Sequence, residues 1–212
     1  MTIAIPRLDR STAAERGLTI ADFLVPVSVA ERVAPRVRHI ALILLGVLVV
    51  TLSARIYIPI QPVPFTGQTF GVLLVGGALG LRRGATALAL YVAIAAAGVP
   101  ILSEGKAGVD AVLGQTGGYL IGFIVAAGVV GRFAELGWDR RLGGSLVSMG
   151  IGSLIIYAIG VPWLKVVLDL TWSQAIAGGL LPFIAWDLAK AAVAGALFPL
   201  GWWLVGRRPD DR

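Results

Sequence analysis

The chain contains no cysteine among its 212 residues, and His39 is its single histidine. Without cysteine there is no disulfide, no thiolate metal site and no cysteine nucleophile. The sequence also lacks an HExxH motif, a serine–histidine pair within its apolar segments, and the GxxxxGK[ST] motif that binds nucleotide phosphates. These absences exclude several catalytic classes and ATP hydrolysis by that route, and our expectation is a protein that has no bound metal or cofactor and is not an enzyme.

Charged residues are scarce as well. They make up 14% of the chain, whereas soluble domains carry about a quarter. Hydrophobic residues reach 57%, and the mean hydropathy is +0.86. Several uncharged runs approach the length of about 20 residues that crosses a bilayer as a helix, and they lack the two-residue alternation of membrane β-strands. These features predict an all-α integral membrane protein.

Six apolar segments follow a polar, arginine-rich N-terminal region. We expect helices at about 39–57, 67–81, 84–101, 116–133, 143–162 and 180–205. The second and third are short and are joined by "RRG", which indicates a buried helical hairpin rather than two lipid-facing spans. The predicted organisation is an N-terminal tail at 1–38, a six-helix transmembrane domain at 39–206 and a C-terminal tail at 207–212.

Three further expectations concern the connecting regions. The first twenty residues lack the apolar core of a cleavable signal peptide, so we expect none. The tail is predicted to contain a short interfacial helix around 20–33. The stretch "WLKVVLDLTWSQAIAGG", residues 163–179, is amphipathic and is predicted to lie along the membrane surface.

The 18 basic residues are distributed unevenly between the connections. Fourteen fall in the two tails, in the 82–84 turn and between the fourth and fifth segments, whereas the alternate connections hold only Arg55, Lys106 and Lys165. Because basic residues are retained in the cytoplasm, this asymmetry predicts six spans with both termini cytoplasmic. It also explains the net charge of +6 without a nucleic-acid partner.

The sixth segment contains "FIAWDLAK", in which Asp187 and Lys190 are surrounded by apolar residues. Positions i and i+3 share a helix face, so the two side chains should pair. A charge at the centre of a bilayer costs about 3 kcal/mol, and intramembrane charges commonly mark substrate or ion paths. We interpret the pair as part of a binding site; the alternative is an ion pair that only fixes helix packing.

A proline-rich loop, "PIQPVPFTGQT" at 59–69, separates the first two segments. Three prolines in six residues exclude a helix there. Irregular backbone at membrane depth needs protein or water around it. Thr66 and Gln68 could therefore cap a pocket from outside, although an ordinary proline-rich turn would have the same composition.

The fourth segment begins with "GQTGGYLIG" at 114–122. Its glycines recur every four residues and favour close helix packing, whereas Thr116 and Tyr119 could bond a ligand. These two residues, the proline-rich loop and the pair in the sixth segment all fall toward the outer side. We expect them to converge on one small-molecule pocket with apolar walls.

Four motifs together resemble the BioY family: "IPIQPVPFTGQTFGVLLVGGALGLRRG", "YVAIAAAGVPILS", "GQTGGYLIGF" and "PFIAWDLAKAAVA". BioY proteins are the biotin-binding S components of energy-coupling factor (ECF) transporters of prokaryotic cytoplasmic membranes. The resemblance implies a six-helix fold with both termini inside and high-affinity capture of biotin from outside. It also implies a partner module of one transmembrane T protein and two ABC ATPases, which some members work without.

The resemblance also implies a set of site residues. It places Asp187 and Lys190 at the polar end of biotin and the 62–68 loop, with Thr66 and Gln68, in a lid. The implied pocket lining is Tyr91, Thr116, Gly117, Gly118 and Tyr119. The alternatives are an S component for another vitamin, or a membrane protein in which the Asp–Lys pair is only structural.

Overall fold

Proline, glycine and threonine mark the ends of several helices. Pro35 is the first residue of its helix, where a missing N–H leaves no hydrogen bond unmade. Gly137 follows another helix with a φ of 83°, and glycine adopts this left-handed conformation without steric cost. Thr171 and Gln174 form a capping box that starts a short helix near the sixth apolar segment.

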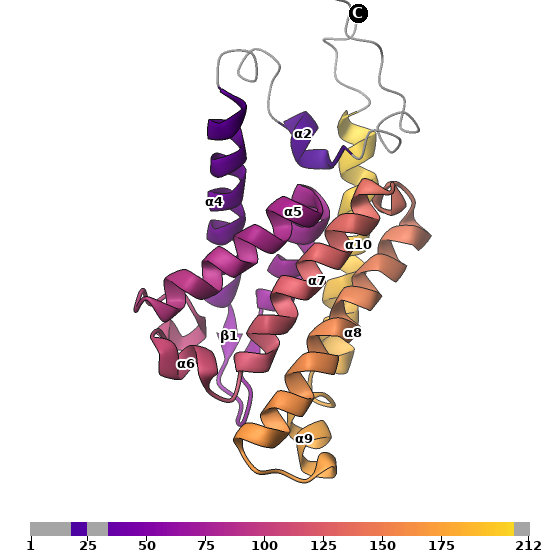
Figure 1. Ribbon diagram of the computed structural model, residues 1–212. Helices are drawn as coiled ribbons and strands as arrows, with labels where there is room; N and C mark the ends of the chain where they lie inside the picture. Colours follow the sequence, from indigo (N-terminus) through magenta and orange to yellow (C-terminus); the bar gives the residue numbers. More distant parts are fainter. Residues whose placement is uncertain (1–17, 25–33, 206–212) are drawn as a thin grey trace, which may run out of the picture.

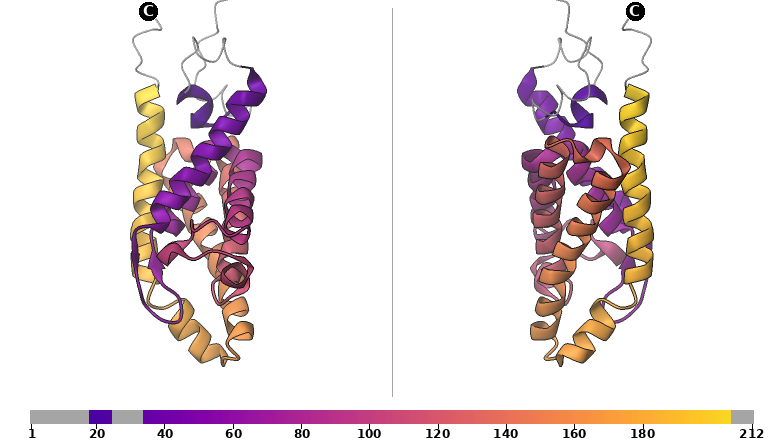
Figure 2. Two further views of the ribbon diagram at one scale, coloured as in Figure 1. Left: turned by 90° about the vertical axis from the view of Figure 1, so that its left-hand side faces the viewer. Right: turned by 90° about the vertical axis from the view of Figure 1, so that its right-hand side faces the viewer.

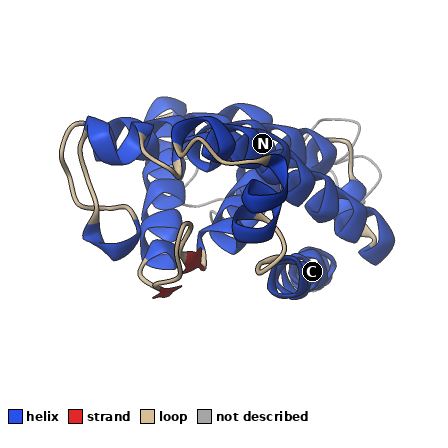
Figure 3. Ribbon diagram, turned by 90° about the horizontal axis from the view of Figure 1, so that it is seen from below, coloured by secondary structure: helices blue, strands red, loops and turns tan. Residues whose placement is uncertain are grey.

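The computed structural model describes residues 18–24 and 34–205. The long helices are α4 (Pro35–Ala54), α5 (Gln68–Ala96), α7 (Gly117–Glu135), α8 (Leu142–Val167) and α10 (Ile184–Val205). The short helices are α2 (Ile20–Leu24), α6 (Val109–Leu113), α9 (Trp172–Gly179) and the 3-10 turns η1 (Ser103–Gly105) and η2 (Trp138–Arg140). Strands β1 (Tyr57–Ile58) and β2 (Phe65–Thr66) pair antiparallel at the edge of the bundle (Figure 3).

The five long helices are each long and apolar enough to cross a membrane. The predicted second and third segments form the single helix α5, which breaks at Gly80, where φ is 83° and ψ is 178°. A Cβ on Gly84 would lie 3.1 Å from the Cα of Gly76, so the two halves run side by side as a hairpin. The number of candidate spans is therefore five, or six if the halves of α5 are counted separately.

The hairpin turns at Gly80, before the expected "RRG" position, because α7 approaches the backbone there. A Cβ on Gly131 would lie 2.3 Å from the carbonyl carbon of Gly80. Glu135 Oε1 accepts a hydrogen bond of 2.9 Å from the N–H of Leu81, the first residue after the break. The hairpin is buried, as expected. In its most apolar 18-residue stretch, 56% of the residues are buried inside the protein, whereas the corresponding share for α4 is 28%.

The charge asymmetry of the sequence is retained in three dimensions. We call one end of the bundle the basic end; it carries α2, the bend of α5, η2 and the C-terminal end of α10 (Figure 1). We call the other the loop end; it carries β1, β2, α6 and α9. Figure 2 shows α10 running between them. Among described residues, the loop-end connections and the helix turn before α9 hold only three basic residues: Arg55, Lys106 and Lys165.

Two connecting regions can be compared with their predictions. The predicted helix around 20–33 corresponds to α2, and residues 25–33 lie outside the described residues. α2 is packed on the bundle, because Thr19, Ile20 and Ala21 are all buried. The predicted stretch 163–179 is divided: α8 continues to Val167, and α9 follows after a turn.

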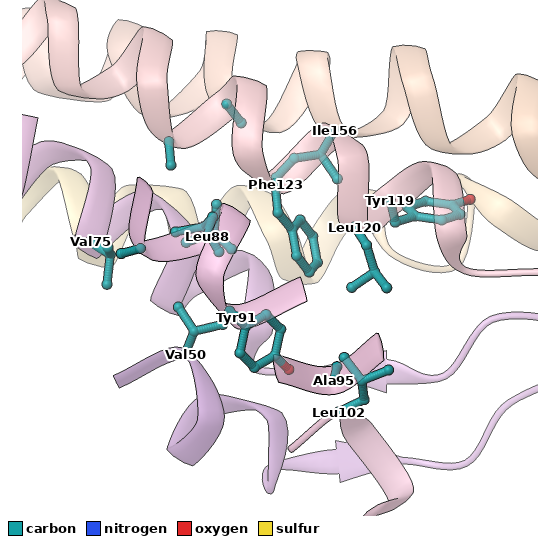
Figure 4. Close-up of a cluster of buried hydrophobic side chains, with 14 of the residues drawn as sticks. Val50, Val75, Leu88, Tyr91, Ala95, Leu102, Tyr119, Leu120, Phe123 and Ile156 are labelled. Carbon is teal, nitrogen blue, oxygen red and sulfur yellow. The ribbon is translucent and has the colours of Figure 1, made fainter. Parts of the chain in front are cut away.

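The main apolar core lies where α4, α7 and α8 pack against the two halves of α5. Close-up views show Phe123 and Leu120 of α7 pointing toward Tyr91 and Leu102 (Figure 4). A second cluster lies nearer the basic end: Ile20, Leu73, Val130, Met149, Ala191, Ala194, Phe198 and Trp202. The space between the loop-end part of the first cluster and the β1–β2 hairpin contains the candidate site.

Candidate functional site

A cavity lies near the loop end, between the β1–β2 hairpin and the helices of the bundle. It contains about 690 Å³ of space outside atoms, including open solvent. Its walls come from the proline-rich loop, α5, the η1 and α6 region, α7, α8 and α10. Its lining residues are Val63, Pro64, Thr66, Gln68, Thr69, Leu102, Ser103, Lys106, Ala111, Thr116, Tyr119, Leu120, Phe123, Tyr157, Phe183, Asp187 and Lys190.

The Asp187–Lys190 pair lies on the first two turns of α10. Lys190 Nζ is 2.8 Å from Asp187 Oδ1, as the i, i+3 spacing predicts. Asp187 is only 4% exposed, so its charge depends on partners supplied by the protein. The pair therefore forms one polar wall of an otherwise mainly apolar cavity.

Lys190 connects α10 to the loop that covers the cavity. Besides Asp187, its Nζ donates to the backbone oxygen of Thr66 at 2.6 Å and to Thr69 Oγ1 at 3.3 Å. It also lies 3.9 Å from the ring centroid of Phe65, within the range of a cation–π contact. An ammonium has three donors, and all three have acceptors here.

Asp187 has two further donors besides Lys190. Thr69 donates to Oδ1 at 3.1 Å, and the Tyr157 hydroxyl of α8 donates to Oδ2. The ring of Tyr157 packs edge-to-face against that of Tyr119, with centroids 6.3 Å apart. Three helices thus hold one carboxylate, and the site is preorganised for hydrogen bonding.

Six of the nine predicted site residues line the cavity. They are Thr66, Gln68, Thr116, Tyr119, Asp187 and Lys190. Tyr91 stands behind the wall: Gln68 Nε2 donates to its hydroxyl at 2.8 Å, and that hydroxyl donates to the Ile101 oxygen at 3.0 Å. Tyr91 is fully buried, so it holds Gln68 and the following loop in place.

Gly117 and Gly118 lie against Trp163 of α8 rather than along the cavity. A Cβ on Gly118 would lie 2.2 Å from the Cβ of Trp163, and one on Gly117 would lie 3.0 Å from its indole nitrogen. That nitrogen donates to the oxygen of Gly114 at 2.9 Å. These glycines let α7 and α8 approach closely, which places Thr116 and Tyr119 at the cavity.

Sequence reasoning missed several lining residues, chiefly Thr69, Tyr157 and Lys106. Tyr157 carried a usable signal, because it is a polar side chain within the apolar run "GSLIIYAIG". Thr69 follows directly on the proline-rich loop, one residue beyond Gln68. Lys106 gave no signal beyond its charge; its Nζ lies 2.5 Å from Glu104 Oε2 and its side chain is 48% exposed.

The β1–β2 hairpin covers the site through aromatic contacts. Phe65 stacks on Phe183 with ring centroids 6.3 Å apart and meets Trp186 edge-on at 6.0 Å. A Cβ on Gly178 would lie 2.9 Å from Pro62 Cδ, so the loop also rests closely on α9. The described residues contain no group of three His, Cys, Asp or Glu side chains that could hold a metal ion.

Known proteins resemble this chain over most of its length. The profile of the BioY family matches residues 25–207. A "Biotin transporter BioY" of Thermotoga maritima is 40% identical over 150 residues, which cover 70% of this chain and 86% of the relative. A "Biotin transporter BioY" of Rhodobacter capsulatus is 35% identical over 169 residues, covering 72% and 87%.

A solved structure has the same fold. It is the crystal structure of the S-component for biotin from an ECF-type ABC transporter, and it matches with a TM-score of 0.72 at 24% identity. The match covers 78% of this chain and 90% of that chain. The helices of this chain are therefore arranged in the fold of that S-component.

Proposed function

The chain belongs to the BioY family, and we propose that it captures biotin outside the cell and serves its uptake as the S component of an ECF transporter. It is a multi-pass membrane protein of a transporter family and not an enzyme. The observation that carries the proposal is the buried Asp187–Lys190 pair at the wall of an apolar cavity beneath the loop-end hairpin.

The chemistry of this cavity suits biotin. Biotin has an apolar fused ring system, a ureido group with two N–H donors and one oxygen, and a tail that ends in a carboxylate. Asp187 can accept from the ureido N–H groups, and Leu120, Phe123 and Phe183 offer apolar surface to the rings. Hydrogen bonds to charged groups contribute about 1.5–3 kcal/mol each, so a few of them with ring burial reach the 12 kcal/mol or so of nanomolar binding.

The two lysines of the cavity suggest which way biotin points. Lys190 is bonded to Asp187, Thr66 and Thr69 in the buried wall of the cavity and its side chain is 17% exposed, whereas Lys106 is paired with Glu104 at the η1 region and is 48% exposed. We assign the ureido group to Asp187 and Lys190 and the tail carboxylate to Lys106. Thr66, Gln68, Thr116 and Tyr119 are assigned to the sides of the ligand, with Tyr91, Gly117 and Gly118 supporting them from behind.

We place the basic end in the cytoplasm and the loop end outside. The support is the basic residues at the α5 bend and around η2, since positive charge is retained on the cytoplasmic side. This orientation gives six transmembrane segments, with α5 as two, and both termini inside. The binding domain is then 39–206, flanked by cytoplasmic tails 1–38 and 207–212, and its energising partners are a T protein and two ABC ATPases.

Purified chain is expected to bind biotin without ATP and to show no ATPase activity, because it has no Walker-type nucleotide motif. Calorimetric titration in detergent measures the first property and phosphate release the second.

Biotin amide, which lacks the tail charge, should bind more weakly than biotin to the unaltered chain. The difference in affinity between the two ligands should be smaller for Lys106→Gln. Absence of biotin binding to monodisperse protein would refute the proposed function.

Reporter fusions are expected to place residues near 105 and 170 outside the cell and residues near 83 and 140 in the cytoplasm. The physical reason is the concentration of arginine at the α5 bend and at η2. Alkaline phosphatase and green fluorescent protein fusions at the four positions measure this. A cytoplasmic signal at 105 would contradict the proposed orientation, because η1 and α6 border the mouth of the cavity.

A further inference from the structure

Tyr91 carries a hydroxyl group behind the wall of the cavity, and its hydrogen bonds have a fixed direction. The side chain is 0% exposed, and the hydroxyl points toward the segment that holds Leu102 (Figure 4). It donates to the backbone oxygen of Ile101 at 3.0 Å. A carbonyl oxygen can only accept, so this bond uses the one proton of the hydroxyl. The hydroxyl oxygen is therefore left to accept from its other neighbour.

That neighbour is the side-chain amide of Gln68, the first residue of α5. Gln68 Nε2 lies 2.8 Å from the Tyr91 hydroxyl and donates to it. The two branches of an amide differ in hydrogen-bonding character, because the nitrogen donates and the oxygen accepts. With the nitrogen held against Tyr91, Oε1 is the branch that remains for other partners. The hydrogen bonds from Gln68 through Tyr91 to Ile101 thus orient the amide.

The oxygen of this amide is available to a ligand. Gln68 lines the cavity although it is only 5% exposed. Within the described part of the chain no donor bonds to its Oε1, and this atom is not enclosed by protein. An amide turned the other way would face the Tyr91 oxygen with a second acceptor, or take the proton from Ile101. A backbone oxygen without its donor costs about as much as a lost hydrogen bond, so the observed orientation is the stable one.

Two other tyrosines at the cavity also donate their hydroxyl protons within the protein. Tyr119 donates to the backbone oxygen of Gly179 at 2.7 Å, and Tyr157 donates to Asp187 Oδ2. Neither hydroxyl has a proton left for a ligand, and both can only accept from one. Together with Gln68 Oε1, they give this wall a set of acceptors. Such a wall favours a ligand that brings N–H groups of its own.

We propose that Gln68 accepts one N–H of the ureido group of biotin, and that Tyr91 is the positioning residue that turns the Gln68 oxygen toward it. The proposal rests on the proposed function, which assigns the ureido group to Asp187. Thr69 directly follows Gln68 and bonds to Asp187 at 3.1 Å, so the two acceptors belong to neighbouring parts of one wall. A ureido group has two N–H donors, and one is assigned to each acceptor.

An amide suits this position better than a second carboxylate. A carboxylate would also accept from an N–H, but it would add a negative charge near Asp187, and a like charge in a buried site disfavours the ionised form of both groups. A fixed amide supplies an acceptor without a charge. An amide that is free to turn would also present its NH2 group, and the bond to Tyr91 prevents this. Gln68 and Tyr91 together therefore determine which hydrogen-bonding group of a ligand is accepted.

Two biotin analogues test this, each with a ring oxygen in place of one of the two ureido N–H groups. The replacement removes a donor, adds no bulk and places an acceptor opposite an acceptor of the site. We expect the unaltered chain to bind both analogues at least tenfold more weakly than biotin in calorimetric titration. Tyr91→Phe leaves the amide free to turn, so the preference for biotin over one of the two analogues should fall at least threefold.

Gln68→Met removes both branches of the amide and keeps the length of the side chain. It should lose the preference against that same analogue. Adding Tyr91→Phe to Gln68→Met should change the affinity for biotin less than twofold, because Tyr91 acts through Gln68. Tyr57→Phe is the matched control, since Tyr57 of β1 is 42% exposed and does not line the cavity. It should leave the preference for biotin unchanged.

A purely structural role of Tyr91 predicts a different result. Tyr91→Phe would then weaken the binding of biotin and of both analogues by one common factor, with or without Gln68→Met, and this result would overturn the proposal. If Tyr91→Phe fails to fold, an unchanged preference for biotin in Gln68→Met would overturn it equally. Failure of the unaltered chain to bind biotin would instead refute the proposed function.

Discussion

Lys190→Ala is expected to weaken biotin binding at least tenfold, about 1.4 kcal/mol, while the protein still inserts into the membrane. The substitution removes the cation that lies 2.8 Å from Asp187 and leaves a carboxylate that is 4% exposed with hydroxyl donors only. Losing one member of a buried pair costs about 3–5 kcal/mol. The substitution also frees the loop that Lys190 bonds through Thr66. Calorimetric titration of the monodisperse fraction measures the affinity.

Asp187→Asn distinguishes a binding role from a packing role of the pair. It preserves the shape of the side chain, removes its charge and turns one acceptor into a donor, so it should also weaken binding at least tenfold. Tyr157→Phe removes one donor to Asp187 and should have little additional effect in the Asp187→Asn background. If the pair only fixed helix packing, Asp187→Asn and Lys190→Ala would each yield less folded protein, but the folded fraction would bind biotin with normal affinity.

Gly118→Ala is expected to lower the free energy of unfolding by about 1–3 kcal/mol, the usual cost of overpacking a core. A Cβ there would lie 2.2 Å from Trp163 Cβ and 2.9 Å from the Ile159 oxygen. Neither atom is the end of a flexible side chain, so α7 and α8 must separate. Thermal unfolding of the purified protein in detergent, followed by light scattering or intrinsic tryptophan fluorescence, measures the loss.

Gly150→Ala is the matched control, since no atom lies within 4 Å of a Cβ at that position of α8. It should unfold at or above the temperature of the unaltered chain, because alanine favours helices over glycine. A Gly118→Ala protein with normal thermal stability but greatly reduced biotin affinity would contradict the packing role. It would place Gly118 in direct contact with the ligand.

The sequence alone determined the class of the protein and predicted the residue pair at the centre of the candidate site. Low charge and long apolar runs leave few possibilities other than membrane helices, because each helix must cross a fixed apolar thickness. The Asp187–Lys190 pair was predictable because i, i+3 proximity depends only on helix geometry. The uneven distribution of arginine needed no tertiary information either, since it follows from counting charges between the spans.

The tertiary structure decided which other residues reach that pair. Thr69 and Asp187 bond across 118 residues of sequence, and Tyr157 reaches the same carboxylate from α8. Helical periodicity shows that a side chain faces the bundle, but it does not identify the helix that it meets. The glycine spacing indicated packing for Gly118 and the hydroxyl of Tyr119 indicated a polar contact, but only the structure shows that Gly118 packs on Trp163 and that Tyr119 lines the cavity.

The same reason explains the break in α5 and the position of α2. Arginine and glycine at 82–84 indicated a turn, but the chain reverses at Gly80. Gly131 of α7 has no side chain, so the backbone at Gly80 can approach it closely, and Glu135 accepts a hydrogen bond from the N–H of Leu81. α2 has too few residues to be stable by itself, so its place depends on Arg38, Arg83 and Gly201 in three separate helices. Local sequence specifies helices and their charges, whereas contacts between distant segments arise only when the helices pack.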